Sequence, residues 1–551
     1  MSNGANILIK TLTQAGIDTC FTNPGTSEMH FVAALDQSDM RAVLCLFEGV
    51  ATGAADGYAR MTNKPAATLL HLGCGLGNGI ANLHNARKAR VPMVNIVGDH
   101  ATHHKQYNAP LESDIETLAR NVSRWIRTST CSENIQSDAQ EAITIAQQHP
   151  QQIATLILPA DTSWGKASFN NDASIHHLHA LADHQRNKNT QPQADSQEVA
   201  ELANILQRHG HKVAIVLGRR ALLEEGLVAA SKIAETTGAK LFCEVFPTRL
   251  QRGAGLPAVE RLAYLSELAS VQLAGYKHLI LIDSTAPVSF FAYPGKKSYL
   301  VPEKCKLHHF ITPEQDAIAH LYALVAAVGG QYTKPQRQIA QRPKLPSGSL
   351  NAAKVCQAVG ALMPEYAILS DEAQTSGLKL PAYTAGAPRH DLLTLTGGAI
   401  GQGLPVAIGA SIGANTDADK TTRAKRPVIA LVGDGSSMYT IQSLWTMVNE
   451  GLDITVIILN NRSYAILNIE LQRVGARQGR RQPRRLVRRA GKIPSRGVVP
   501  RDRARRGAVA WAAGLDRRRC DASRELLDGA GLNGSHGIGR KAEREDTRVR
   551  G

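Results

Sequence analysis

Short apolar runs alternate with longer amphipathic stretches along most of this chain. Two such runs, residues 426–432 and 454–459, enclose residues 437–450, which fit a helix with an apolar face made by Ile441, Leu444, Trp445 and Val448. Short, continuous apolar runs are typical of strands that are buried on both faces. The pattern therefore predicts a strand–helix–strand unit whose two parallel strands end at the same edge of a sheet.

The same alternation predicts an α/β protein with three parallel-sheet domains that carry helices on both faces. Further candidates for buried strands are residues 43–47, 67–70, 154–159, 213–218 and 278–283. Polar segments poor in core residues separate the domains, and we interpret residues 171–195 and 336–349 as linkers. The predicted domains are then residues 1–170, 196–335 and 350–471. A chain of 551 residues is too long for one hydrophobic core, which agrees with this division.

Polar motifs follow both strands of the first predicted unit. Gly433-Asp434-Gly435 ends one strand, and Asn460-Asn461 ends the other. The Asp434 carboxylate, the Asn461 amide and a backbone carbonyl near Ser463 are oxygen ligands of the kind that Mg²⁺ prefers beside phosphates. The two glycines would let a phosphate approach the backbone, and the helix that follows would favour an anion. The alternative is a strand-to-helix turn that uses Asp and Gly for its geometry alone.

Several motifs in order along the chain extend this interpretation. They are Asn23–Glu28, Phe47–Gly49 with Ala54–Ala59, Gly73–Asn78, Gly397–Pro405, and the Gly433-Asp434-Gly435 and Asn460-Asn461 pair. Together they resemble the thiamine diphosphate (ThDP) enzymes of the acetolactate synthase, benzoylformate decarboxylase and pyruvate decarboxylase group. The resemblance implies pyrimidine-binding, central and diphosphate-binding domains, with ThDP and Mg²⁺ as cofactors. It also implies the decarboxylation of a 2-oxo acid.

The resemblance assigns roles to individual residues. Glu48 matches the glutamate that hydrogen-bonds the aminopyrimidine ring of ThDP and so activates the cofactor. Without the resemblance, Glu48 is a glutamate at the start of a helix, where it interacts with the helix dipole. Ile400 matches the apolar residue that wedges ThDP into its bent shape, and Gly398 matches a residue that offers its backbone carbonyl, as an acceptor, to the aminopyrimidine. Residues that match the diphosphate-contacting positions are Gln374, Thr375, Gly433, Gly435 and Ser436.

The substrate side of the predicted site is less determined. Thr26 and His71 match a serine and a histidine that face the substrate in the benzoylformate decarboxylase branch, although His71 also suits a structural role at a strand end. A second histidine of that branch is not found around residues 289–293, and the Gln-Trp segment of acetolactate synthases does not follow Asn461. Three readings stay open: acetolactate synthase-like decarboxylation with carboligation, decarboxylation of an aryl 2-oxo acid without carboligation, and an inactive ThDP-binding relative.

Glu48 and Asp434 lie in different predicted domains, and in the resembled family the cofactor bridges two subunits. The resemblance therefore implies a homodimer or homotetramer with sites at the subunit interface. Some relatives hold FAD in the central domain, but Gly218-Arg219-Arg220 is too short a motif to indicate it here. The eight cysteines show no paired spacing, and no apolar stretch is long enough to cross a membrane, so we expect a cytoplasmic protein.

The last part of the chain differs in composition from the rest. Residues 473–551 hold 21 Arg, 2 Lys and 8 acidic residues, which accounts for +15 of the net charge of +16. Clustered arginines suit a nucleic-acid-binding arm, but an abrupt change inside a predicted domain is also what an out-of-frame reading of GC-rich DNA would give. We favour the second interpretation for residues 472–551. On this interpretation the diphosphate-binding domain is truncated, and we do not expect nucleic acid to be a partner.

Overall fold

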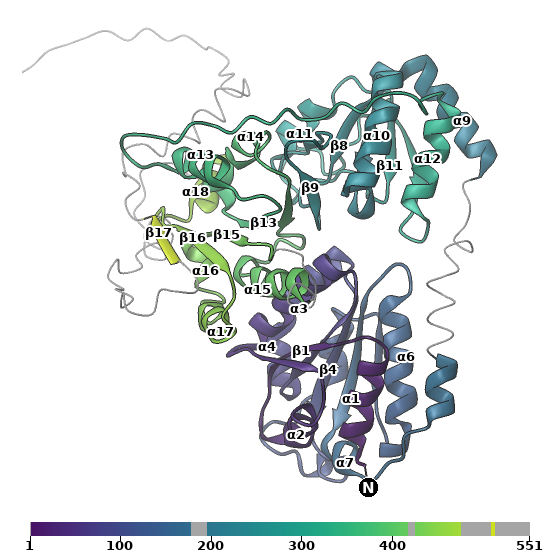
Figure 1. Ribbon diagram of the computed structural model, residues 1–551, viewed down its shortest axis with the longest axis vertical. Coiled ribbons are helices and arrows are strands. Elements are labelled where there is room, and N and C mark those ends of the chain that lie inside the picture. The colour runs from purple at the N-terminus through teal and green to yellow at the C-terminus, as the bar shows by residue number, and fades with distance from the viewer. Residues whose placement is uncertain (1, 178–194, 417–424, 475–508, 513–551) are drawn as a thin grey trace, which may run out of the picture.

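The computed structural model contains three sheets, each flanked by helices (Figure 1). It describes residues 2–177, 195–416, 425–474 and 509–512. In Figure 1 the first domain lies at the bottom, and the central and third domains lie side by side above it. Almost all strand pairs are parallel, so the predicted α/β class with three parallel-sheet domains is confirmed.

The first sheet has the strand order β2-β1-β3-β4-β6-β5 and is parallel throughout. Its strands are β1 (Thr19–Asn23), β2 (Arg41–Leu44), β3 (Ala66–Leu70), β4 (Met93–Asp99), β5 (Trp125–Thr128) and β6 (Ile153–Pro159). Helices α1 (Gly4–Gln14), α2 (Met29–Leu35) and α6 (Ile135–Gln147) cover one face. Helices α3 (Glu48–Thr62), α4 (Leu72–Ala89) and α5 (Ile115–Arg120) cover the other. The short helix α7 (Ala160–Trp164) follows β6.

The central sheet has the order β10-β8-β7-β11-β12. Its strands are β7 (Val213–Leu217), β8 (Lys240–Cys243), β10 (Glu260–Arg261), β11 (His278–Ile282) and β12 (Lys306–Ile311). Helices α9 (Ser196–His209), α10 (Glu224–Thr237) and α12 (Ala317–Ala327) pack on one face, and α11 (Ser266–Leu273) packs on the other. The buried apolar strands β7 and β11 begin where the hydrophobic pattern places them.

The third sheet has the order β17-β16-β15-β13-β14-β9. Its parallel strands are β13 (Ile368–Glu372), β14 (His390–Thr394), β15 (Val428–Gly433), β16 (Ile454–Leu459) and β17 (Val509–Ala512). Strand β9 (Leu250–Arg252) comes from the central part of the chain and pairs antiparallel with β14. The helices of this domain are α13 (Ala352–Leu362), α14 (Leu380–Tyr383), α15 (Gly403–Asn415), α16 (Asp434–Ser437), α17 (Ser443–Asn449) and α18 (Ala465–Arg473).

The single helix predicted over residues 437–450 is wrong. The helix that lies within this range is the shorter α17, because α16 ends at Ser437, the first residue of the range, and turns separate the two helices. The predicted apolar face is covered in part: Leu444 packs against the core of this chain, whereas Trp445 is 41% exposed and Val448 is 71% exposed. The described residues of this chain therefore leave the rest of the face open.

Other parts of the predicted boundaries can now be placed. Residues 171–177 at the start of the predicted first linker are helical, and the Gln136 side chain on α6 bonds the backbone of Asn170 just before them. Residues 332–350 have almost no regular structure and run across the top of Figure 1 into the third domain. Of the Arg-rich segment 472–551, only 472–474 and β17 lie within the described residues, so its out-of-frame interpretation stays a prediction.

Helices α3 and α15 join the first and third domains through a close backbone contact at the centre of Figure 1. A Cβ atom added at Gly57 would lie 2.2 Å from the Val406 carbonyl oxygen, and one at Gly409 would lie 1.7 Å from the Ala54 carbonyl oxygen. Only glycine allows two helices to approach this closely. The hydrophobic core of the first sheet continues across this contact into the third sheet.

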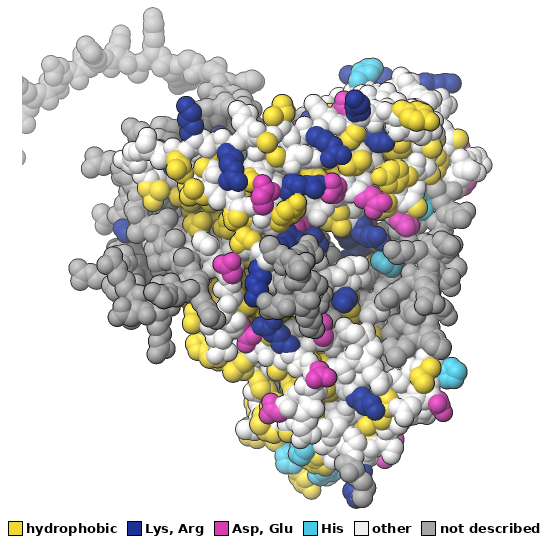
Figure 2. Space-filling model, in the orientation of Figure 1, with side chains coloured by type: hydrophobic (Ala, Val, Ile, Leu, Met, Phe, Trp, Pro, Cys, Tyr) yellow, Lys and Arg dark blue, Asp and Glu magenta, His cyan; other side chains and the backbone are white. Residues whose placement is uncertain are grey.

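Side chains on the face shown in Figure 2 are mixed in type, with hydrophobic groups over the third domain near α17 and Lys and Arg groups around the junction of the domains. Within the described ranges, no helix combines the length and the apolar character needed to cross a bilayer.

We predict that Gly409→Ala destabilises the protein by about 1–3 kcal/mol, because the new methyl group would overlap the α3 backbone. The urea midpoint of unfolding measures this effect. Gly77→Ala is the matched control, because a Cβ there has no neighbour within 4 Å and α4 would gain helix propensity of about 1 kcal/mol at most. Equal midpoints for the two variants would contradict the close α3–α15 contact.

Candidate active site

Glu48 begins helix α3 directly after the loop that follows strand β2. Its side chain is buried, with 5% exposed, and its Oε2 accepts a hydrogen bond from the Asn78 amide on α4 at 3.0 Å. A Cβ at Gly75 would lie 2.9 Å from Glu48 Oε1 and 3.4 Å from His71 Cβ. The absence of a side chain at Gly75 therefore lets α4 approach two of the predicted catalytic residues at once.

His71 precedes α4 and is held by a second buried carboxylate. Its Nδ1 lies 2.9 Å from Glu28 Oε2, and Glu28 also accepts hydrogen bonds from the Gly25 backbone and the Ser27 hydroxyl. An ionised Glu28 would keep a proton on Nδ1 and leave Nε2 as the free proton acceptor of the ring. Leu72, the next residue, is buried with φ +48°, a strained conformation of the kind that clusters at functional sites.

Thr26, the other predicted substrate residue, is exposed at the start of the 3₁₀ turn η1 (Thr26–Glu28). The hydroxyl that approaches the histidine is that of Ser27, at 3.4 Å from His71 Nδ1. The structure thus brings His71, Glu28 and Ser27 together, and it leaves Thr26 beside them on the surface.

The loop Gly397–Gly403 is clamped between the first domain and strand β13. Asn85 on α4 bonds both the backbone N–H and the carbonyl of Ala399, at 3.1 and 2.8 Å. Asn82 donates to the Gly49 carbonyl at 2.7 Å and to the Gly401 carbonyl at 3.4 Å. A single amide therefore links the residue after Glu48 to the loop that carries Gly398 and Ile400.

Glu372 holds the same loop from the other side. Its two carboxylate oxygens accept hydrogen bonds from the backbone N–H groups of Gly401 at 2.6 Å and Gly403 at 2.7 Å. Burial raises the pKa of Glu372 to about 7, although these hydrogen bonds act in the opposite direction. Gly398 and Gly401 have φ +79° and +97°, so the loop conformation requires glycine at both positions.

The Gly-Asp-Gly and Asn-Asn motifs lie next to each other at the carboxyl ends of β15 and β16, as predicted. Backbone N–H groups of Gly435 and Arg462 bond the Asp434 carboxylate, while burial raises its pKa. The Asn461 Oδ1 accepts a hydrogen bond from the Ser463 N–H at 2.9 Å. Asp434, at the start of α16, therefore lies against the turn that holds Asn461 and Ser463.

Three observations show that this turn fits a metal-bound diphosphate. A Cβ at Gly433 or Gly435 would meet no atom closer than 3.7 Å, so space is open beside both glycines. The buried Oδ1 of Asn460 has no hydrogen-bond partner among the described residues. The donors are a carboxylate and amide oxygens, which suit Mg²⁺. Within the described part of the chain, no three His, Cys, Asp or Glu side chains are arranged so that they could hold a metal ion.

The remaining predicted cofactor residues surround this turn or the loop. Ser436 is buried in α16, with its Oγ 3.7 Å from a Cβ placed on Gly433. Gln374 is exposed with φ +50°, and Thr375 is half-buried in the same 3₁₀ turn, Gln374–Gly377, which follows β13. Ile400 is half-buried in the clamped loop.

An aromatic cluster lies over Gly398. The Phe290 Cζ would be 2.4 Å from a Cβ at Gly398, and the Phe290 ring lies 5.1 Å from Tyr264, 5.1 Å from Phe291 and 6.0 Å from Phe246. The central domain therefore contributes an apolar wall beside a predicted cofactor residue.

Sequence reasoning did not assign roles to Glu28, Asn82, Asn85, Glu372 or Phe290. Glu28 lies inside the motif Asn23–Glu28, so the sequence could have indicated it as a candidate site residue. Phe290 lies in the segment searched for a histidine. The two asparagines and Glu372 act on partners far away in the chain, and no local pattern marks them.

Family models match both ends of this chain. The thiamine pyrophosphate enzyme N-terminal TPP-binding domain matches residues 2–119, and the C-terminal TPP-binding domain matches residues 375–493. IlvX of Mycobacterium tuberculosis, provisionally named an acetolactate synthase large subunit, is 53% identical over 475 residues, which cover 86% of this chain and 87% of that protein. Benzoylformate decarboxylase of Pseudomonas aeruginosa is 26% identical over 83% of this chain and 85% of that protein.

Solved structures agree in fold. The ThDP-dependent 4-hydroxybenzoylformate decarboxylase of Rhodococcus jostii superposes with a TM-score of 0.70 at 22% identity, covering 87% of this chain and 90% of that one. Benzoylformate decarboxylase of Polynucleobacter necessarius superposes with a TM-score of 0.69 at 21% identity, covering 87% and 89%. Both have the same three-sheet architecture.

Glu372 should make stability depend on pH. The pKa of Glu372 is about 7 in the folded protein, above its ordinary value of 4.5. The Glu372 carboxyl therefore binds its proton more tightly in the folded protein than in the unfolded chain. The contribution of Glu372 to stability is therefore present below pH 4.5 and is lost as pH rises to about 7. Relative to Glu372→Gln, the wild type should lose about 2 kcal/mol between pH 5 and 7.5. Urea unfolding of both proteins at both pH values measures the difference, and parallel pH dependence would refute it.

Proposed function

The chain belongs to the thiamine pyrophosphate enzyme family, and on that premise we propose that it catalyses the ThDP- and Mg²⁺-dependent decarboxylation of a 2-oxo acid. The observation that carries the proposal is the Asn82 amide, which joins the residue after the buried Glu48 to the clamped loop Gly397–Gly403. When bound, ThDP supplies the electron sink that decarboxylation of a 2-oxo acid needs.

The protein's own contribution begins with two protonatable groups. Glu48, at the start of α3, would hold a proton for the aminopyrimidine of the cofactor, and Asn78 fixes the orientation of its carboxylate. His71 carries a proton to or from the substrate at Nε2, and Glu28 fixes its ring and tautomer. Thr26 and Ser27 border this side of the site.

Cofactor and metal would be held by residues of the third domain. Asp434, Asn461 and the Ser463 carbonyl would supply oxygen ligands to Mg²⁺, and the Asn461 amide would exchange its turn hydrogen bond for the metal. Gly433, Gly435 and Ser436 would hold the diphosphate together with Gln374 and Thr375. Gly398 and Ile400 would contact the body of the cofactor, in a loop that Glu372 and Asn85 keep rigid.

The decarboxylation can end with or without transfer of the acyl group to a second carbonyl compound. Likeness to IlvX supports acetolactate synthase-like chemistry, in which the acyl group passes to a second carbonyl compound. The aromatic cluster at Phe290 favours the second candidate, decarboxylation of an aryl 2-oxo acid without carboligation. A flat apolar wall would bind a phenyl ring better than the methyl group of pyruvate.

A second copy of the chain is the proposed partner. Leu44 and Leu46 lie just before Glu48 and are 40% and 45% exposed, and the Leu44 carbonyl accepts a hydrogen bond from Thr446 on α17. The apolar face of α17, with Trp445 and Val448, is therefore continuous with the approach to Glu48. A homodimer that buries this surface, with the site at the subunit interface, accounts for the exposed apolar residues.

Glu48→Gln should abolish turnover of 2-oxo acids while leaving the thermal stabilisation by ThDP and Mg²⁺ intact, because it removes a proton-holding group and no metal ligand. Asp434→Asn should reduce that stabilisation. A panel of pyruvate, 2-oxobutyrate, benzoylformate and branched 2-oxo acids measures turnover. Glu225→Gln on the exposed side of α10 is the control. Retained turnover in Glu48→Gln would refute its role, and no turnover by the wild type with any acid would favour the inactive relative.

Phe290→Ala should lower kcat/KM for benzoylformate about tenfold and change the value for pyruvate little, since the lost contact is worth about 1–2 kcal/mol with an aryl ring. Steady-state kinetics with both acids measures the ratio. Tyr322→Ala, an exposed aromatic residue on α12, is the control. An equal loss for both acids would argue against an aryl substrate.

The double variant Trp445→Asp/Val448→Asp should be monomeric at micromolar concentration, because two carboxylates would be desolvated in the interface. Light scattering coupled to size-exclusion chromatography measures the mass. Val271→Asp on α11 is the control, since Val271 is equally exposed but lies in the central domain. An unchanged mass in the double variant would exclude α17 from the interface.

A further inference from the structure

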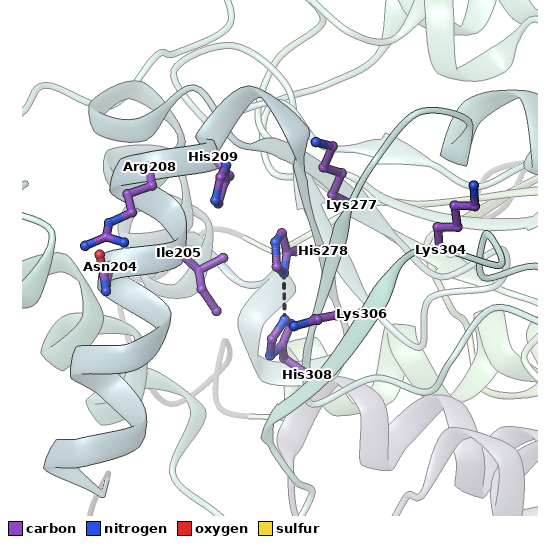
Figure 3. Close-up of a pocket in the computed structure, with 9 residues that line it drawn as sticks. All are labelled: Asn204, Ile205, Arg208, His209, Lys277, His278, Lys304, Lys306 and His308. Atoms are coloured by element: carbon purple, nitrogen blue, oxygen red, sulfur yellow. Dashed lines mark hydrogen bonds between the residues drawn. The ribbon is translucent and has the colours of Figure 1, made fainter.

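A hollow lined by basic side chains lies in the central domain, away from every residue assigned above. It lies between the end of helix α9 and the first residues of strands β11 and β12, and its volume is about 400 Å³ (Figure 3). Its lining residues are Asn204, Ile205, Arg208, His209, Lys277, His278, Lys304, Lys306 and His308. A volume of this size accommodates a small molecule.

The hollow concentrates positive charge without compensation. Four of its lining residues are always or usually cationic, three more are histidines, and none is acidic. No ion pair among the described residues involves Arg208, Lys277, Lys304 or Lys306, although many other surface lysines and arginines of this chain are paired, such as Lys240 with Glu260. Unpaired like charges at close range repel each other, so an anion bound in the hollow would offset the repulsion among these cations.

Three imidazoles form the floor of the hollow. His278 stacks between His209 and His308, with ring centroids 5.6 and 5.3 Å apart, and its Nδ1 lies 3.1 Å from His308 Nε2. Figure 3 shows the three rings in a row, with the lysines and Arg208 around them. His278 and His308 are half-buried, so these rings are fixed by packing and are not freely rotating surface groups.

The charged groups around His278 are all of one sign. Burial lowers the pKa of His278, and His209 from α9, Lys306 from β12 and the adjacent Lys277 lower it further. Burial, His278 and Lys306 lower the pKa of His308 in the same way. A bound anion would reverse this effect, because it favours the protonated rings.

The position of the hollow separates it from the cofactor motifs. In parallel α/β sheets, ligands usually bind beyond the carboxyl ends of the strands. His278 and Lys306 are the first residues of β11 and β12, so the hollow lies at the opposite, amino-terminal edge of the central sheet. It is therefore a site in addition to the one in the third domain.

We propose that this hollow binds a small anion that carries adjacent phosphate groups. Four fixed cations match the charge of a diphosphate, and lysines and arginine are the side chains that bind phosphate oxygens. The imidazole row offers further N–H donors once protonated. Inorganic pyrophosphate and the diphosphate end of a nucleotide share this chemistry, and the experiment distinguishes them.

Calorimetric titration with pyrophosphate, ADP, AMP and citrate tests the proposal. The full chain is first saturated with ThDP and Mg²⁺, and the excess of both is removed before the titration. We expect one site per chain, at least tenfold tighter for pyrophosphate and ADP than for AMP or citrate, and tighter at pH 6 than at pH 8. Equal affinity for pyrophosphate and ADP identifies the diphosphate group as the feature bound. Citrate binding as tightly as pyrophosphate would overturn phosphate selectivity.

A charge-matched pair of variants locates the site. Lys277→Ala/Lys306→Ala should lose at least tenfold in pyrophosphate affinity. Lys334→Ala/Lys344→Ala, which removes the same charge from exposed positions on the segment between the central and third domains, should bind like the wild type. His308→Gln, which keeps the lysines and removes one of the three imidazoles, should reduce the difference between pH 6 and pH 8. Equal affinities for the two double variants would overturn the proposal.

Discussion

The buried ion pair between Asp56 and Arg60 is the interaction on which the placement of the other parts depends. Both side chains are inaccessible to solvent and meet at 2.7 and 2.8 Å through two parallel hydrogen bonds. Arg60 also donates to the carbonyls of Thr248 and Thr394 and to the Thr396 hydroxyl. One guanidinium on α3 thus holds the first, central and third domains together. Removing one partner would leave an uncompensated buried charge, at a cost of about 3–5 kcal/mol.

The same ion pair determines where the clamped loop lies. Gln402 donates to Asp56 at 2.5 Å, so the end of the loop Gly397–Gly403 is tied to the middle of α3, whose first residue is Glu48. Close packing at Gly57 and Gly409 fixes the distance between α3 and α15. Glu48 and the loop therefore have little freedom relative to each other, so the parts that each subunit would contribute to the interface sites keep a fixed geometry, as preorganised catalysis requires.

The two proposed binding sites differ in how they are built. The third-domain site uses backbone groups and few charges at the carboxyl edge of a parallel sheet, as expected for a diphosphate held through a metal. The hollow in the central domain uses side-chain cations at the amino edge. A ligand there would act on the enzyme through the central domain, which also supplies Phe290 and the antiparallel strand β9.

The sequence by itself determined the α/β class, most strands and the order of the motifs, because apolar runs and glycine-rich turns are local signals. It also indicated Glu48, His71 and Asp434 as candidate site residues through their motifs. Tertiary structure decided the rest. Glu28 holds a histidine 43 positions away, Glu372 holds a loop 29 to 31 positions away, and Asn82 reaches Gly401 across 319 positions. The helix predicted over residues 437–450 is limited to α17, and Trp445 and Val448 of its predicted apolar face stay exposed in this chain. Hydrophobic periodicity specifies that a face is apolar, whereas only the assembled structure specifies what it packs against.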